Sequence, residues 1–496
     1  MMLWKNLPWW RILRILVAGV VLLVLMGGTW FFPGYEKVFV SQFGSSLLAL
    51  TSAFSLGAFL AVAAVAAVTL LVGRLYCSIL CPLGILQDLM MLFKGRFAFQ
   101  GAYRRIKYPF FFLVLGLACA GLMLPLAFLM PSANFVAIEN HVFREVCARV
   151  FYWLDLPIGE VTVHPVLGGF ISAWAVFILL AILVRWRGRI YCNTLCPVGA
   201  LLSSIAKFSY WKITLTDRCV RCGACERVCK SGCIDVKNRR VINENCVMCL
   251  NCIGKCKFSA LKFEHRKPAL ENRVPVSGAR REFLIAGGAL VAGLAAGKAA
   301  HALGGRKISA EDYAPAMPPG AVSYDRFASR CVSCGLCIAA CKGHVLAHAT
   351  GQYGLRGFLQ PYMRFSNGAC EFNCNECIKV CPCGALDKLA LDEKKHWRVG
   401  LARYVETRCI SYIDGTDCGA CAEHCPVGAL EMVPYKETTI PKVHENLCIG
   451  CGACENICPA RPVKAIRVNG VAKQHFVEKP VATKSAVLDS EEDFPF

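Results

Sequence analysis

Long runs of apolar residues dominate the first two hundred positions of the chain. Four of them reach the length of about 20 residues that a membrane-crossing helix needs; they cover roughly residues 12–32, 47–72, 108–130 and 166–184. Core helices of soluble proteins rarely stay apolar for so long, whereas these runs are nearly free of charge. The pattern predicts an α-helical membrane bundle with four spans, within residues 1–210.

Positive charge gathers before the first run, between the second and third runs, and after the fourth. The residues are Lys5, Arg11, Arg14, Arg74, Lys94, Arg96, Arg104, Arg105, Lys107, Arg185, Arg187 and Arg189. Loops rich in lysine and arginine stay in the cytoplasm, so both ends of the bundle are expected there. This rule partly explains the net charge of +21. No aromatic–basic RNA-binding pattern occurs, and we expect no nucleic-acid partner.

The bundle contains an internal repeat. The sequence GRLYC at residues 73–77 runs on to CPLG at 81–84, and GRIYC at 188–192 runs on to CPVG at 196–199. Each segment closes a pair of spans, which predicts two two-helix units related by an axis along the membrane normal. Both C-x3-C-P motifs then lie at the cytoplasmic end.

The repeat suggests a metal centre. Cysteines four apart share one helix face, and the following proline kinks or ends the helix. We expect Cys77, Cys81, Cys192 and Cys196 to converge near the pseudo-twofold axis, where they would hold an additional cluster or a soft metal such as Cu(I). The alternative is that they are buried packing residues, as free cysteines often are.

Six further groups of cysteines carry the strongest chemical signal. Four groups have the spacing C-x2-C-x2-C-x3-C, which binds [4Fe-4S] clusters and sends its fourth thiolate to a neighbouring cluster. They begin at Cys219, Cys246, Cys331 and Cys448, and two groups with a longer first gap begin at Cys370 and Cys409. Zinc sites and disulfide scaffolds fit this spacing poorly. The groups predict six [4Fe-4S] clusters in α+β ferredoxin-like modules.

Residues 211–270 are expected to form a compact two-cluster ferredoxin on the cytoplasmic side. With the usual exchange of the fourth ligand, the two ligand sets are Cys219, Cys222, Cys225 and Cys256, and Cys246, Cys249, Cys252 and Cys229. Cys233 is left over. Lys230 and Lys257 stand where proline is usual in such runs.

Residues 271–305 resemble an export signal. Arg280 and Arg281 precede Phe283, Leu284 and a weakly apolar Ala/Gly-rich run to about residue 302, as in twin-arginine signals. Such signals normally stand at the N-terminus, so an internal one suggests a fusion. The run is expected to remain as a fifth, anchoring span. Residues 306–496 would then lie outside the cytoplasm, with an acidic tail at their end.

In this order the parts resemble a fusion of NapH and NapG. Residues 1–270 resemble NapH through the two GR-[LI]-YC-x3-CP repeats and the paired ferredoxin runs. Residues 275–480 resemble MauM/NapG-type four-cluster ferredoxins through RREFL and the four following cysteine groups. The resemblance implies a quinol dehydrogenase component in the bacterial inner membrane. Its partners would be the quinone pool and a periplasmic reductase or cytochrome, as in nitrate respiration.

Resemblance to four-cluster electron-transfer subunits also implies a nested pairing of the last four groups, first with fourth and second with third. The implied ligand sets are, in turn, Cys331, Cys334, Cys337 and Cys458; Cys448, Cys451, Cys454 and Cys341; Cys370, Cys374, Cys377 and Cys425; and Cys409, Cys418, Cys421 and Cys381. Cys383 is left over, and the choice between it and Cys381 as the ligand stays open.

Two other functions stay open. The same membrane repeat resembles NosR and CcoG, which implies a thiol- and cluster-dependent reductase that supports copper or other metal-centre assembly. The third possibility is a passive anchor subunit without a quinone site of its own.

Quinol oxidation needs a proton acceptor near the outer face, but the sequence identifies no catalytic residue. The candidates in the second outer connection are Glu139, His141, Glu145 and His164. No histidine lies in the four spans and no C-x-x-C-H motif occurs, so no haem is expected. A hydrocarbon layer of about 30 Å is too wide for one electron-tunnelling step. Either the C-x3-C-P thiols hold an intermediate electron carrier, or quinol itself carries the electrons across the membrane.

Overall fold

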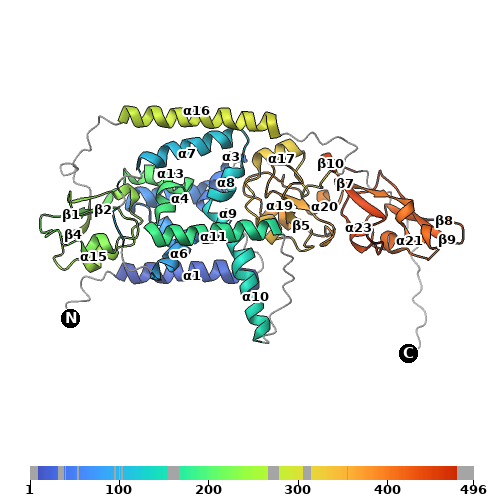
Figure 1. Ribbon diagram of the computed structural model, residues 1–496, viewed down its shortest axis with the longest axis horizontal. Coiled ribbons are helices and arrows are strands. Elements are labelled where there is room, and N and C mark those ends of the chain that lie inside the picture. The colour runs from blue at the N-terminus through green and yellow to red at the C-terminus, as the bar shows by residue number, and fades with distance from the viewer. Residues whose placement is uncertain are drawn as a thin grey trace.

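Long helices lie side by side in the middle of the molecule, with a cysteine-rich module at each end (Figure 1). The structure is a computed structural model. It describes the residues of the following ranges: 9–31, 38–39, 41–52, 55–93, 97–99, 101, 104–154, 167–265, 279–304, 314–354 and 356–477. In chain order a helical region is followed by a small cysteine-rich module, a single long helix and a larger cysteine-rich half.

The helical region is built from the apolar runs and the connections between them. In chain order its helices are α1 (Trp9–Phe31), α3 (Phe43–Ser52), α4 (Leu56–Val72), α5 (Tyr76–Ile79), α6 (Pro82–Met90), α7 (Arg104–Cys119), α8 (Leu124–Leu129), α9 (Pro131–Ile138), the π-helix η3 (Glu139–Phe143), α10 (Arg144–Trp153), α11 (Leu167–Arg187), α12 (Ile190–Thr194) and α13 (Pro197–Ala206). After the first ferredoxin comes α16 (Ala279–Gly304).

Fewer uninterrupted spans are present than the sequence predicts. Among the described residues, two helices are long and apolar enough to cross a membrane, Gly168–Arg187 and Arg281–Ala300. The expected span at 47–72 is divided between α3 and α4. The expected span at 108–130 ends early, because Gly121 has a φ of 83° and a proline stands in the first turn of each of the next two helices. Proline is favoured in the first turn of a helix and positive φ at a helix end, so each marks a boundary.

The outward faces of the long helices are apolar. On α11, Ile171 and Ile182 are 56% and 58% exposed, and on α16, Phe283 and Leu284 are 78% and 72% exposed. Contiguous exposed apolar surface of this kind is typical of contact with another apolar phase. Lipid is such a phase.

The helix that follows the twin arginine packs closely against the bundle. A Cβ atom on Gly293 of α16 would lie 2.4 Å from the Leu113 carbonyl oxygen of α7, and one on Gly116 of α7 would lie 2.4 Å from the Leu290 carbonyl oxygen. Small residues that let two helix backbones approach are typical of helix association in membranes. The contact favours a retained helix over a cleaved signal.

Gly293→Ala is expected to weaken this contact by about 2 kcal/mol, the usual cost of overpacking, because the added methyl group meets backbone atoms. Gly287→Ala on the same helix is the control, since nothing lies within 4 Å of the position its Cβ would take. The measurement is the melting temperature of each variant in detergent. Equal melting temperatures would contradict the packing described here.

The first ferredoxin module is small. The strand β1 (Trp211–Leu215) pairs antiparallel with β4 (Leu261–His265), and β2 (Ile234–Asp235) pairs with β3 (Arg240–Val241). Two one-turn helices complete it, α14 (Ala224–Arg227) and α15 (Asn251–Lys255). Two-stranded sheets are only marginally stable by themselves, so the interior of this module needs another source of cohesion. Its core consists largely of cysteines.

The C-terminal half repeats this plan twice. Its elements are α17 (Tyr324–Arg330), α18 (Leu336–Ala339), β5 (Leu346–His348), β6 (Pro361–Met363), α19 (Glu376–Lys379), α20 (Leu391–Lys395), β7 (Trp397–Tyr404), α21 (Ile410–Ile413), α22 (Ala420–Glu423), β8 (Leu430–Tyr435), β9 (Thr438–Val443), α23 (Ala453–Ile457) and β10 (Ile466–Phe476). The antiparallel pairs are β5–β6, β8–β9 and β7–β10. The pair β5–β6 belongs to the part nearer the bundle, and the other two pairs belong to the far part (Figure 1).

Candidate metal centres

The first ferredoxin module holds two sets of thiols. Its described cavity is lined by five cysteines, Cys229, Cys233, Cys246, Cys249 and Cys252, together with apolar side chains such as Ile213 and Val241. Four of them, all except the spare Cys233, are the residues that the sequence predicts for one cluster. A cavity whose polar lining is almost entirely thiol fits an iron–sulfur cluster.

The second set of this module surrounds Cys225. Burial, together with the neighbouring Cys219 and Cys256, raises the pKa of the Cys225 thiol to about 11. Cys222, the remaining residue expected in this set, is exposed. Binding of iron would ionise these thiols, since a metal displaces the thiol proton.

In the C-terminal half the structure brings together different thiols from those expected. Each of three cavities is lined by four cysteines, in turn Cys341, Cys370, Cys374 and Cys377; Cys425, Cys448, Cys451 and Cys454; and Cys409, Cys418, Cys421 and Cys458. A fourth set is indicated by electrostatic interaction of Cys381 with Cys331, Cys334 and Cys337.

The nested pairing is therefore wrong, and the cysteine groups pair in sequence, first with second and third with fourth. Cys458 lies with Cys409 and not with Cys331, and Cys381 lies with Cys331 and not with Cys409. The one-turn helices contact each other in the same way, α18 with α19 and α22 with α23, as α14 does with α15. Pairing neighbours closes shorter loops than pairing the two ends of the domain, at a lower entropic cost.

The four outer sets lie in a row that starts at the bundle. Gly335, between Cys334 and Cys337, faces Val136 of α9, whose Cγ1 would be 3.8 Å from a Cβ there. Farther out, the Cys370 amide donates to the Cys451 carbonyl oxygen at 2.9 Å. This contact joins the two middle sets. The set with Cys458 is then the outermost (Figure 1).

Two spare cysteines lie against expected ligands. The sulfur atoms of Cys233 and Cys229 are 3.5 Å apart, and those of Cys383 and Cys381 are 3.9 Å apart. A hydrogen bond from the spare thiol lowers the pKa of Cys229 and of Cys381 to about 7. The substitution of Cys383 for Cys381 that the sequence suggests is sterically available.

The C-x3-C-P cysteines also come together. Cys77, Cys81, Cys192 and Cys196 are each at most 5% exposed, and they are close enough to interact electrostatically. Cys81 and Cys196 are the residues that precede the first turns of α6 and α13, and in each helix the first residue is the motif proline. The repeat thus places four thiols at one buried point.

The arginines of the repeat exchange partners around these thiols. Arg74 donates to the Cys192 carbonyl oxygen at 3.0 Å, and Arg189 donates to the Cys77 carbonyl oxygen at 2.6 Å. Gly84 and Gly199 allow this approach, since a Cβ on either would lie 2.2 or 2.1 Å from the same carbonyl oxygens. The reciprocal contacts are the expected pseudo-twofold relation at atomic scale.

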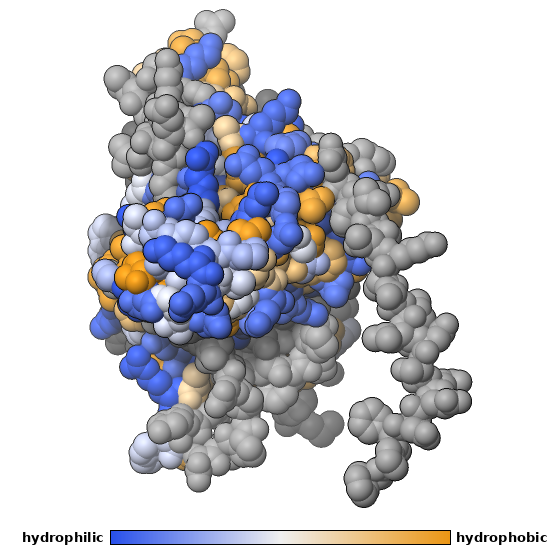
Figure 2. Space-filling view, turned by 90° about the vertical axis from the view of Figure 1, so that its right-hand side faces the viewer, coloured by the Kyte–Doolittle hydropathy of each residue, from blue (hydrophilic) through white to orange (hydrophobic). Residues whose placement is uncertain are grey.

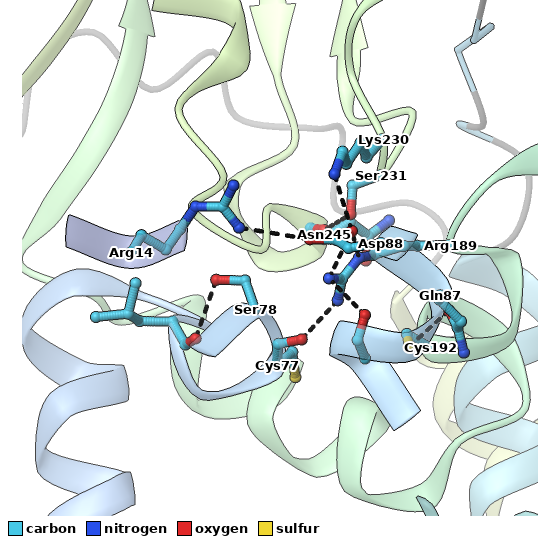
Figure 3. A network of polar contacts seen from close by, with 12 residues as sticks. Arg14, Cys77, Ser78, Gln87, Asp88, Arg189, Cys192, Lys230, Ser231 and Asn245 are labelled. Atoms are coloured by element: carbon cyan, nitrogen blue, oxygen red, sulfur yellow. Dashed lines mark hydrogen bonds and ion pairs between the residues drawn. The ribbon is translucent and has the colours of Figure 1, made fainter. Parts of the chain in front are cut away.

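The site carries more positive than negative charge. Asp88 forms ion pairs with Arg189 at 2.8 Å, Lys230 at 3.3 Å and Arg14 at 3.4 Å (Figure 3). Arg74 is fully buried, and no carboxylate pairs with it among the described residues; its partners are the Asn193 side chain at 2.9 Å and the sulfur of Cys77 at 3.8 Å. A buried charge without a counter-ion is costly. Thiolates holding a metal centre would supply the missing negative charge.

Asp88→Asn is expected to lower stability by about 3 kcal/mol, because it leaves three cations without their shared carboxylate. Burial opposes ionisation, but Arg189 and Lys230 outweigh it and hold the pKa of Asp88 below its usual value. The ionised Asp88 therefore contributes fully to the free energy of unfolding at pH values above the pKa of an unfolded aspartate, which is about 4. This contribution is lost as the pH falls through the lower pKa that Asp88 has in the folded protein. Melting temperatures against pH measure both effects. The exposed Asp217→Asn is the control, and equal losses in both variants would contradict the network.

The candidate proton acceptors lie at the opposite end of the bundle. Glu139 and His141 belong to the π-helix η3, and Glu145 lies in the first turn of α10. His164 is outside the described residues. Burial and the nearby His348 lower the pKa of His141 to about 3, so the ring is neutral at physiological pH. His348 comes from the C-terminal half, so the structure brings Glu139 and His141 to the junction of the two parts.

Sequence reasoning missed Arg74, Arg189, Asp88 and His348 as parts of these sites. The arginines stand in the repeated GR-[LI]-YC motif and were counted only as topological charges. Nothing in the local sequence marks Asp88 or His348, because their partners are far away in the chain.

Iron–sulfur domain families match several parts of the chain. A family described as "4Fe-4S binding domain" matches residues 54–100 and 167–216, which include both C-x3-C-P motifs. Another family with the same description matches residues 216–232 and 328–353, and a "4Fe-4S dicluster domain" family matches residues 416–461.

The relatives are ferredoxin-type proteins. MauM, the "methylamine utilization ferredoxin-type protein" of Methylorubrum extorquens, is 35% identical over 199 residues, which are 37% of this chain and 86% of MauM. The chain belongs to the MauM/NapG family of ferredoxin-type proteins. NapG of Escherichia coli is 35% identical over 152 residues, 28% of this chain, and the chain spans 64% of its length. NapF of the same organism is 28% identical over 150 residues, 30% of this chain and 82% of NapF.

No solved structure matches the chain. The protein is thus an iron–sulfur electron-transfer protein.

Proposed function

We propose that this membrane-bound protein passes electrons between the quinol pool and a periplasmic redox partner, in a respiratory chain of the nitrate-reductase type. In this proposal residues 1–270 are a NapH-type unit fused to a NapG-type unit. The observation that carries the proposal is a continuous series of buried thiol sites from one end of the molecule to the other.

The first step of this series joins the small ferredoxin to the C-x3-C-P thiols. The Lys230 carbonyl oxygen accepts from the Arg189 amide at 3.1 Å, and the Ser231 carbonyl oxygen accepts from Asn193 at 3.0 Å. Cys249 belongs to the same apolar core as the four thiols. The small ferredoxin is therefore in direct contact with the second repeat.

The second step joins these thiols to the outer half through α9. Tyr191, the residue before Cys192, accepts a hydrogen bond from Asn134 of α9 at 3.1 Å. Two residues later in the same helix, Val136 contacts Gly335 of the C-terminal half. Asn134 and Val136 of α9 thus link the two sites, and every residue of α9 except Ala137 is buried. In this proposal α9 shortens the electron path across the bundle.

We propose a membrane topology on the same basis. The spans are α1, α3 with α4, α7, α11 and α16, with the cation-rich connections and the small ferredoxin in the cytoplasm of a bacterium. The C-terminal half then lies in the periplasm. Figure 2 views the molecule from that end, where hydrophilic residues cover most of the coloured surface. Such a surface suits an aqueous compartment and a protein partner.

The cofactors proposed are six [4Fe-4S] clusters in the ferredoxin sets and a seventh at Cys77, Cys81, Cys192 and Cys196. A cluster held by four thiolates has a net charge of about −2 when oxidised, which would balance Arg74 and the excess charge around Asp88. A single Cu(I) ion would need the thiols closer together. Among the described residues, no group of three or more His, Cys, Asp or Glu side chains is arranged to hold one ion.

The alternative, a reductase for copper or other metal-centre assembly, is less well supported. Such a protein must present its thiols to a metal donor, whereas Cys77, Cys81, Cys192 and Cys196 are all buried. The four outer sets in a row also suit onward electron transfer better than local thiol chemistry.

Anaerobic reduction by duroquinol tests the proposal. The full chain is purified in detergent, oxidised, and mixed with duroquinol while its cluster absorbance is followed. We expect bleaching to a level set by the cluster potentials, and reoxidation by a periplasmic cytochrome fraction. Reduction by dithionite without any reduction by duroquinol would overturn the quinol assignment, and reduction of Cu(II) by the same sample would favour the alternative.

A further inference from the structure

We propose that the quinol binds at the junction of the helical region and the C-terminal half, beside the paired rings of His141 and His348. This inference rests on the proposed function and assigns its substrate site. The two imidazole rings come from η3 and from β5, more than two hundred residues apart in the chain, and their centroids are 5.7 Å apart.

A glycine of α11 makes room for the two rings. A Cβ on Gly169 would lie 2.8 Å from Nε2 of His141 and 2.7 Å from Cδ2 of His348. Real Cβ atoms do not approach ring atoms so closely, so a larger residue would displace at least one ring. Three separate elements, η3, α11 and β5, therefore meet at one point.

The tautomer of His348 is set by its own half of the protein. Its Nδ1 donates to the Leu359 carbonyl oxygen at 2.8 Å, since a carbonyl can only accept. Nε2 is then an acceptor. Burial lowers the pKa of His348, so the ring stays neutral and suits a hydroxyl group that donates to it.

Buried polar atoms without a partner concentrate in this region. Among the described residues they include Nδ1 of His141, Oδ1 of Asn140 and Nε1 of Trp174. Buried polar atoms are almost always paired, so a group of unpaired ones calls for a specific explanation. A quinol hydroxyl group could donate to Nδ1 of His141 or Oδ1 of Asn140, and its oxygen could accept from Nε1 of Trp174.

Aromatic side chains line the same part of α11 and η3. Phe143 packs edge-on against Phe177 with ring centroids 5.9 Å apart, and Trp174 packs edge-on against Phe177 at 6.0 Å. Exposed apolar residues flank them, Ile171 on α11 and Val146 on α10. Aromatic and apolar side chains beside a few unpaired polar atoms suit a lipid-soluble ring with two hydroxyl groups.

The nearest electron acceptor is on the other side of His348. Its Cε1 and Nε2 would be 3.6 and 3.7 Å from a Cβ on Gly335, which stands in the loop of Cys331, Cys334 and Cys337. Oxidation of one quinol to quinone breaks two O–H bonds and releases two electrons and two protons. A cluster held by Cys331, Cys334, Cys337 and Cys381 would accept the electrons one at a time. The protons would pass to the neutral imidazole of His141 and from there to the outer aqueous side.

Photolabelling with an azido-substituted quinone tests where quinol binds in the intact holoprotein. We expect labelled peptides that contain residues 139–146, 168–177 or 346–350, and loss of label when duroquinol competes. Label confined to other peptides would overturn the inference. This measurement needs no variant, so it stands even where a substitution prevents folding.

Kinetics of duroquinol oxidation test the two histidines and the glycine. His141→Gln, His348→Gln and Gly169→Ala are each expected to raise KM about tenfold, the effect of losing one hydrogen bond worth about 1.4 kcal/mol. Iron content and reduction by dithionite should stay unchanged. His424→Gln, an exposed histidine in the same half, is the control and should behave as wild type.

The outcomes separate this inference from the proposed function. If duroquinol reduces the wild type and all three variants with the same KM, the site is wrong while the quinol reaction stands. If duroquinol does not reduce the wild type at all, both fail. If the unpaired atoms merely hold ordered water, the variants will keep the wild-type KM and the photolabel will be elsewhere.

Discussion

Replacing Cys192 and Cys196 together by alanine is expected to remove about four iron atoms per chain, one cube, and to stop electron exchange between the two ends of the molecule. The four C-x3-C-P thiols are buried at one point and are surrounded by arginines that lack sufficient carboxylate partners. Without the cluster at the C-x3-C-P thiols, no electron carrier remains between the small ferredoxin and the outer half. Iron quantitation and stopped-flow reduction measure the two effects.

The control for this double variant is Cys119→Ala, which changes an exposed cysteine of the helical region. It should keep the full iron content. The electron paramagnetic resonance signals of the six ferredoxin clusters should persist in both variants and report that the chain is folded. An iron content unchanged by the double variant would show that the four thiols are packing residues.

Replacing Cys458 by serine is expected to expose three particular thiols to alkylation. In the structure Cys458 shares a cavity with Cys409, Cys418 and Cys421, so loss of that cluster frees those three. Nested pairing would instead free Cys331, Cys334 and Cys337. Treatment of the folded variant with iodoacetamide under anaerobic conditions, followed by peptide mass spectrometry, distinguishes the two sets.

Cys341→Ser is the matched second variant. It should free Cys370, Cys374 and Cys377, because these line one cavity with Cys341. In the nested arrangement the freed thiols would be Cys448, Cys451 and Cys454. If either variant yields the nested pattern, the sequential pairing of cysteine groups is wrong.

Cysteine spacing identified the thiol groups but not their pairing. The spacing of two, two and three residues describes how one loop places three thiolates around a cluster, which is a local property of the sequence. The partner group of Cys381 or Cys458 depends on the tertiary contacts among α18, α19, α22 and α23. The two groups of the first module have only each other as partners, so there the exchange of the fourth ligand leaves no choice of pairing.

Apolar runs located the helices but not their interruptions. Gly121 and Pro125 are visible helix breakers within the run at 108–130, and Pro131 follows directly after it, so the run could have been divided from the sequence. Nothing in the local sequence shows that α9 packs inside the bundle. Its burial follows from contacts with Tyr191 and Gly335, which are distant in sequence.

The site residues missed by sequence reasoning share one physical property. Arg74 and His348 act through partners from other parts of the chain, Asn193 in one case and His141 in the other. A periodic pattern reports which face of an element is apolar. It does not report which distant residue faces a given polar group.

The most direct test of the central claim is the iron and acid-labile sulfide content of the full chain, purified without oxygen. Seven thiol sites that each hold a cube predict about 28 atoms of each per chain. A content of about 24 would remove the cluster at the C-x3-C-P thiols and leave the two ends unconnected. Only traces of iron and sulfide would contradict the whole account.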